Sequence, residues 1–149
     1  MPSIPQLVDG PQIIVNPTLE ELITLRLEEL LFGLRGVDLF EGPLGDGGPY
    51  PEAAIGALEA AGGFLEPLAG PDAHDLGTVR VQVTVRGKKD GYTATRHKAE
   101  QVCSALHKKE LGGSIYACFA DTPFFVRRDK RGRDYLAINL TIKTFSKRS

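Results

Sequence analysis

The stretch that most constrains the fold of this chain is the alternating run from Thr78 to Arg86. Valine occupies every second position, and polar residues stand between the valines. Successive side chains of a strand point to opposite faces, so this period of two predicts a strand with one buried face. Burying each valine contributes roughly 1.5–3 kcal/mol before the loss of chain entropy is subtracted. The run therefore predicts a central strand that covers a hydrophobic core.

The hydrophobic period changes directly after this strand. Residues 87–91 predict a turn, and the apolar residues from Tyr92 to Leu111 recur at helical spacing, with Tyr92 on the apolar stripe. The glycines at 112–113 are expected to end this helix. In the simplest arrangement the apolar stripe of the helix lies on the valine face of the strand.

A second amphipathic helix is predicted near the N-terminus. Thr18 and Glu21 match a capping box, in which each residue binds the backbone of the other. Leucines then continue an apolar stripe as far as Leu34, and Gly33 and Gly36 mark the expected end of the helix.

Shorter strands and loops connect and follow these elements. The segment 53–60 is ambiguous between helix and strand, and strand is favoured. The sequence also predicts short strands at 13–15 and 37–41, loops at 42–51 and 62–75, a strand at 114–120, and a hairpin whose strands, 123–126 and 135–143, flank a charged turn at 127–133.

Together these elements define an α+β fold with a mainly antiparallel (mixed) β-sheet and two amphipathic helices packed on one face. A chain of 149 residues is long enough to bury a core, so one domain over residues 13–149 is expected. Residues 1–12 contain three prolines and no periodicity, and are interpreted as a flexible N-terminal arm.

Charge is distributed unevenly along the chain, although its net value is only −1. Residues 1–77 carry 13 acidic and two basic residues, a net of −11, whereas residues 78–149 carry six acidic and 16 basic residues, a net of +10. The two halves either neutralise each other within one subunit or supply an acidic face that meets a basic face on a neighbouring copy.

Residues that would carry catalysis or hold a metal form no recognisable motif. Phosphate-binding glycine loops, nucleophile elbows and zinc-protease helices have no match in the sequence, so no enzymatic activity and no cofactor are expected. Cys103 and His107 are spaced to share a metal on one helix, but a complete ligand set is not evident. Cys103 and Cys118 are expected to be buried thiols. Neither a signal peptide nor a membrane span is predicted.

The turn at 127–133 is the strongest local feature of the basic half. Four of its residues within five positions are basic. Three interpretations remain open: docking onto an acidic protein surface, a solvated hairpin tip, or contact with nucleic-acid phosphates. Arg80 and Arg86, on the polar side of the central strand, would extend the basic surface.

Several of these segments resemble one family of tailed-bacteriophage proteins. The similarity lies in V-Q-V-T-V-R-G at 81–87, a following tyrosine (Tyr92), and K-A-E-Q-V-C-S-A-L-H at 98–107. It continues with Pro123-Phe124-Phe125, Asp129, Gly132-Arg133 and Asn139, and the stretch E-A-A-I-G-A-L-E-A-A-G-G at 52–63 matches the segment before the central strand. The resemblance, over roughly residues 18–145, is to the minor capsid or tail terminator proteins that act in head–tail joining.

That resemblance implies a structural function in the virion, with assembly in the cytoplasm of a bacterial host. A tail terminator forms a homo-oligomeric ring, usually of six copies, on the end of the tail tube and stops the addition of tube protein. Its other face receives the connector or head-closure protein, and viral DNA passes through the lumen without specific binding. Membrane association is not implied. The alternatives are a neighbouring head-closure or tail-completion protein of the neck, or a nucleic-acid-binding module that uses the 127–133 hairpin.

A closed ring needs a different patch on each side of every subunit. The charged residues are the candidates for these subunit and partner contacts. The candidate interface residues are Arg80, Gln82, Arg86, Arg127, Arg128, Lys130, Arg131, Arg133, Glu20, Glu28, Asp46 and Asp72.

Overall fold

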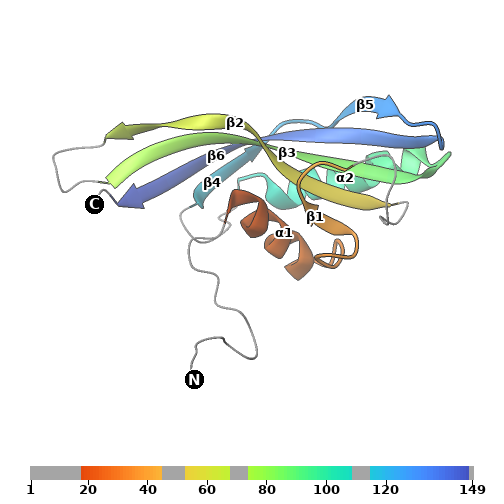
Figure 1. The fold of residues 1–149 in the computed structure, drawn as a ribbon, viewed down its shortest axis with the longest axis horizontal. Helices are drawn as coiled ribbons and strands as arrows, with labels where there is room; N and C mark the ends of the chain where they lie inside the picture. The colour runs from red at the N-terminus through yellow and green to blue at the C-terminus, as the bar shows by residue number, and fades with distance from the viewer. Residues whose placement is uncertain (1–17, 45–52, 68–73, 109–114, 148–149) are drawn as a thin grey trace, which may run out of the picture.

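The computed structural model describes residues 18–44, 53–67, 74–108 and 115–147, which form two helices and one mixed sheet (Figure 1). The elements in chain order are α1 (Leu19–Glu29), β1 (Leu39–Glu41), β2 (Ala54–Pro67), β3 (His74–Lys89), α2 (Tyr92–Leu106), β4 (Ile115–Ala120), β5 (Phe124–Arg128) and β6 (Arg133–Lys147). The expected strand at 13–15, most of the loop at 42–51, and the glycines at 112–113 lie outside the described residues.

The sheet has the strand order β1-β2-β3-β6-β4, and β5 also pairs with β6. Only the β1–β2 pair is parallel; the other pairs are antiparallel. β4 pairs with residues 140–144 of β6 and β5 with residues 134–137, so β4 and β5 follow each other along one edge of β6. The predicted α+β class, with its mainly antiparallel sheet, is confirmed.

The core lies between the sheet and the two helices. Val81, Val83 and Val85 of β3 are buried, as the alternation predicted, and pack with apolar residues of β6. α1 packs against β1 and β2, whereas α2 packs against β3, β6 and β4. Figure 1 shows both helices on the same side of the sheet. The apolar stripes of the two helices and the valine face of β3 therefore bury one another.

The start of α1 agrees with the sequence, but its end does not. Thr18 Oγ1 accepts a hydrogen bond from Glu21 N–H at 3.1 Å, and Glu21 Oε1 accepts one from Thr18 N–H at 2.9 Å. The hydrogen bonds that the Glu21 carboxyl accepts from Thr18, above all the one from the Thr18 backbone N–H, hold the pKa of this carboxyl below its ordinary value. The helix was expected to continue to about Gly36, yet it ends at Glu29.

A Schellman motif ends α1 early. Leu31 adopts a left-handed conformation with φ +67°, its N–H binds Glu28 O at 3.0 Å, and Phe32 N–H binds Leu27 O at 2.9 Å. Phe32 then packs against the core that contains Leu27. The chain reverses direction at this point so that Phe32 contacts the core. As a result, the leucines that follow Glu29 no longer continue the buried stripe of α1 and are exposed.

β2 and β3 extend further than the sequence indicated. The ambiguous segment 53–60 is a strand, as favoured, but pairing between the two strands continues to Pro67 and Asp75. The prediction of a loop over 62–75 was therefore wrong, except at residues 68–73, which lie outside the described part. The pairing of β2 with β3 shifts register between Glu59 and Ala61 and again between Ala61 and Phe64. Such irregularities accommodate the glycines and alanines of this stretch, which have a weak preference for strands.

The turn from β3 into α2 depends on Gly87. A Cβ at this position would overlap the buried Thr95 hydroxyl, which donates a 2.7 Å hydrogen bond to Gly91 O. Gly87 thus lets the first turn of α2 approach the end of β3. The helix ends at Leu106 rather than Leu111, because the following residues bind β4: Lys108 N–H donates to Cys118 O at 2.6 Å.

Candidate functional site

The predicted hairpin of β5 and β6 is present, but its strands extend into the basic segment 127–133 that was expected to be the turn: Arg127 and Arg128 belong to β5, and Arg133 begins β6. Gly132 N–H binds Asp129 O and Asp129 N–H binds Arg133 O, both at 3.0 Å, which closes a three-residue loop. Gly132 has φ +78°, the left-handed conformation that this type of loop requires at its last position. Lys130 and Arg131 are exposed on the loop.

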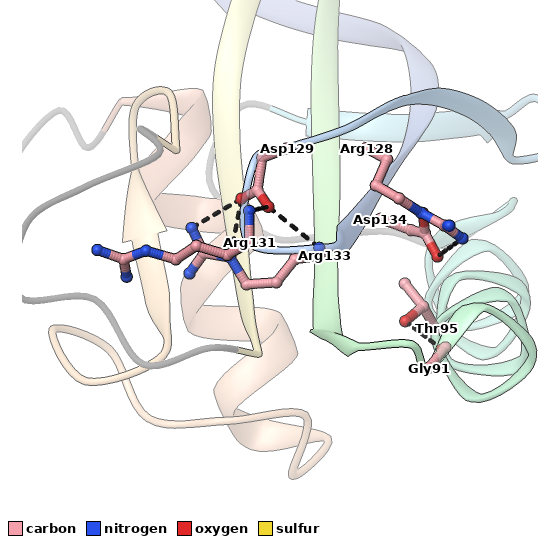
Figure 2. A network of polar contacts seen from close by, with 7 residues as sticks. All are labelled: Gly91, Thr95, Arg128, Asp129, Arg131, Arg133 and Asp134. Atoms are coloured by element: carbon pink, nitrogen blue, oxygen red, sulfur yellow. Dashed lines mark hydrogen bonds and ion pairs between the residues drawn. The ribbon is translucent and has the colours of Figure 1, made fainter.

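Asp129 organises this tip from the inside (Figure 2). Its Oδ1 accepts hydrogen bonds from the backbone N–H groups of Arg131 and Arg133, at 2.9 and 3.0 Å. Its Oδ2 accepts from Arg133 Nε at 2.8 Å and from the Tyr135 hydroxyl at 3.1 Å. Burial acts to raise the pKa of the Asp129 carboxyl, but these donors outweigh it and hold the pKa well below its ordinary value.

Arg133 and Arg86 do not present a basic surface. Both side chains are buried, at about 1% exposure, and Arg133 Nη2 pairs with Asp129 Oδ2 at 2.7 Å. The expectation that Arg86 extends the basic surface was therefore wrong, and Arg133, expected to lie in the basic turn, is likewise covered. Local sequence gives the charge of a side chain, but whether it is covered depends on distant segments. On the sheet face opposite the helices, Leu44 and Ala54 pack against Tyr135, the partner of Arg86 in β6.

Arg127 and Arg128 are more exposed but have partners in the subunit. Arg128 Nε pairs with the buried Asp134 Oδ1 at 2.7 Å, which raises the pKa of Arg128 (Figure 2). The Arg127 guanidinium lies 4.0 Å from the centroid of the Tyr135 ring, a cation–π distance. Arg127 and Arg128 are therefore positioned by contacts within the subunit, whereas Lys130 and Arg131 are exposed at the tip of the hairpin.

The remaining candidate interface residues are spread over the molecule. Arg80 is exposed on the sheet face away from the helices, where Gln82 Nε2 donates to Asn139 Oδ1 at 3.1 Å. Glu20 accepts a hydrogen bond from Glu59 N–H at 3.0 Å, and Glu28 accepts one from Arg35 N–H at 2.8 Å. Asp46 and Asp72 lie outside the described residues.

Two groups of exposed apolar side chains were not predicted. The leucine patch, between α1 and β1, consists of Leu30, Leu31, Leu34 and Val37. The β5 patch consists of Tyr92, Phe124, Phe125 and Val126. Tyr92 and Phe125 are in contact, with 6.3 Å between their ring centroids, whereas Phe124, one position earlier on β5, points to the other face of the sheet.

Both patches left signals in the sequence. Leu30-Leu31-Phe32 is a run of three apolar residues, and such a run cannot lie entirely on one face of a helix. Phe124-Phe125-Val126 is a run of three on an edge strand, whose alternate side chains point away from the core.

The thiols and histidines do not form a metal site. Among the described residues, no three potential metal ligands lie together. His107 Nδ1 instead accepts a hydrogen bond from Ala120 N–H at 3.0 Å, and both cysteines are free. Burial raises the pKa of the Cys118 thiol to about 12, and burial with nearby Asp121 and Glu100 raises that of Cys103.

A cavity of about 390 Å³ lies between the end of β3 and the start of α2. Gly87, Thr95 and three lysines are among its lining residues.

Within the described segments no helix is long and apolar enough to cross a membrane.

The mixed sheet with two helices on one face defines the chain as an α+β protein. Its described surface carries apolar and basic patches, and no cluster of metal ligands occurs among the described residues. No protein-family model matches it, and neither does any curated protein. Sixteen chains of solved structures match its fold. One belongs to a structure described as the virion of a native gene transfer agent particle, with TM-score 0.62 and 12% sequence identity over 86% of this chain and 95% of that chain. The two chains therefore share a fold over nearly their whole lengths.

Proposed function

We propose that this protein is a non-enzymatic structural component of a phage-like virion, and specifically a tail terminator. In this role six copies form a ring that caps the tail tube and stops the addition of tube protein. The opposite face of the ring receives the head-closure or connector protein, and DNA passes through the lumen without specific binding. The subunit would be a single domain preceded by an N-terminal arm, assembled in the host bacterial cytoplasm.

The observation that carries this proposal is the fold shared with a virion chain over almost the full length of both proteins. Two features of the surface support it. Ring subunits need two distinct contact patches, and the described part of the surface carries the leucine patch and the β5 patch on separate elements. The hairpin adds exposed positive charge from Arg128, Lys130 and Arg131, which suits docking onto an acidic protein surface.

Tube assembly in the presence of the protein tests the proposal. Purified major tail protein should polymerise into tubes of shorter mean length as the protein is added, and electron microscopy should show rings at tube ends. A control variant, Gln101→Glu with Ser104→Lys, changes two exposed positions on α2 and should shorten tubes as the wild type does. Tube lengths that are unaffected at a large excess of protein would contradict the proposal.

Two other functions predict different results in the same experiment. A head-closure or tail-completion protein would bind connector particles in sedimentation but leave tube lengths unchanged. A nucleic-acid-binding module would bind DNA with an affinity that falls steeply with salt, through Lys130 and Arg131. The carboxylates held by Arg128 and Arg133 lower the net charge that the hairpin offers to phosphates, so the capping function is favoured.

A further inference from the structure

The leucine patch holds the most exposed large apolar side chain of the described residues. Leu31 is 90% exposed, and it adopts φ +67°, a left-handed conformation that is unfavourable for a residue with a Cβ. Glycine is the usual residue at this position of a Schellman motif. Nothing within the described subunit uses the Leu31 side chain, so its strain and exposure together point to a contact with another molecule.

The leucine patch and the β5 patch lie at opposite edges of the sheet. The leucine patch leads into β1, the first strand of the order β1-β2-β3-β6, and β5 lies on the far side of β6. Four inter-strand spacings of about 4.8 Å separate β1 from β5, roughly 19 Å in all. In Figure 1, α1 lies below the strands, whereas β5 runs along β6 at the upper edge of the sheet. One patch therefore cannot contact the other within a single subunit.

The charges around the two patches are complementary. Residues 18–44, which carry the leucine patch, contain six acidic and two basic residues, a net of −4. The segments 86–98 and 124–134, which carry and surround the β5 patch, bring eight basic residues and one acidic residue to the surface, a net of +7, once their four buried charged residues are left out. Joining two copies through the same patch would oppose like charges, whereas joining the leucine patch to the β5 patch opposes unlike charges.

We propose that the leucine patch of one subunit docks on the β5 patch of the next, with Leu31 and Leu34 facing Phe124 and Val126. The contact is head-to-tail, so its repetition closes a ring if the rotation per subunit allows. Apolar side chains supply the buried area, and the surrounding charges select the partner patch and the register. This inference rests on the ring-forming role proposed above and assigns the residues of the subunit contact.

A mixing experiment with two variants tests the contact. The first variant carries Leu31→Asn and Leu34→Lys, because asparagine tolerates the left-handed conformation and the lysine would oppose the basic surface. The second carries Phe124→Glu and Val126→Glu on the exposed edge strand. Circular dichroism and thermal unfolding establish that both fold, and Gln101→Glu with Ser104→Lys serves as the control away from both patches.

The wild type and the control should assemble in sedimentation velocity. Each patch variant alone should associate at least about 30-fold more weakly than the wild type, as for loss of an interface hot spot. An equimolar mixture of the two variants should give a dimer and nothing larger, because each retains the patch that the other lacks. This result identifies a head-to-tail contact between these two patches.

Other results would overturn the inference. These are a wild type that stays monomeric at its highest soluble concentration, a variant that assembles as the wild type does, a variant that forms a dimer with itself, and a mixture that stays monomeric. Tube-length measurements distinguish this failure from failure of the proposed function. If rings form and cap tubes with either variant, the capping function stands and only the assigned contact is wrong.

Discussion

Arg133 reaches back across the tip of the β5–β6 hairpin to Asp129, with 2.7 Å between Nη2 and Oδ2 and 2.8 Å between Nε and Oδ2. Both side chains are buried, so the pair is an internal brace of the hairpin. Removing one partner of such a pair leaves an uncompensated buried charge, which costs more than the pair itself contributes.

Asp129→Ala should therefore lower the free energy of unfolding by about 3–5 kcal/mol, because Arg133 keeps its charge without its main acceptor. Chemical denaturation at neutral pH measures this change. Lys130→Ala, one residue along the same turn but exposed, should stay within about 0.5 kcal/mol of the wild type. The double variant Asp129→Ala with Arg133→Met should recover part of the loss. Equal stability of Asp129→Ala and Lys130→Ala would show that the brace is unimportant.

The same carboxylate should make stability depend on acid pH. Its pKa is lower in the folded than in the unfolded chain, so its contribution is complete above the unfolded pKa of about 3.9 and is lost as pH falls below that value. Glu21 acts in the same direction. Unfolding curves between pH 7 and pH 2 should fall less steeply for Asp129→Asn than for the wild type. Parallel curves would contradict this assignment.

Gly87→Ala should destabilise the protein by about 1–3 kcal/mol, because the added methyl group overlaps Thr95 at the start of α2. Thr95→Ala alone should cost about 1 kcal/mol through loss of the hydrogen bond to Gly91 O. Since Thr95→Ala also removes the hydroxyl that overlaps most with the added methyl group, the double variant should be less destabilised than the sum of the single variants. Additive losses in a thermal-unfolding cycle would argue against the close approach.

Leu31→Gly should raise the stability of the isolated subunit by about 0.5–1 kcal/mol, since it removes left-handed strain without losing buried surface. Leu34→Gly is the matched control. Leu34 is also an exposed leucine, but its φ is not positive, so glycine there should destabilise. Denaturation at concentrations where the protein is monomeric measures both. A loss of stability in Leu31→Gly would contradict the strain.

The two thiols should react at different rates. Cys103 is partly exposed and Cys118 is buried, with its pKa raised to about 12. Because the thiolate is the reactive form, a thiol reagent at pH 8 should label Cys103 slowly and leave Cys118 unmodified until the protein unfolds. Mass spectrometry of peptides with and without denaturant distinguishes the two sites. Rapid labelling of Cys118 in the folded protein would show that the core opens there.

The local patterns in the sequence determined much of the secondary structure. The alternating valines of β3, the capping box of Thr18 and Glu21, and the charged hairpin turn all depend on residues within a few positions of one another. Such patterns fix which face of an element is apolar, and hence the α+β class. The sequence also showed that the hairpin is rich in basic residues, but not which of these side chains are exposed.

Only the tertiary structure decided which polar and apolar side chains are covered. Packing of Phe32 into the core ends α1 at Glu29 and leaves Leu31 exposed. The folding of Leu44 onto Tyr135 covers the second face of the sheet beside Arg86, and the hairpin turn brings Arg133 onto Asp129. Whether a side chain is buried depends on which residues from distant segments pack against it. Hydrophobic periodicity shows only which face of a helix or strand is apolar, and not what covers that face.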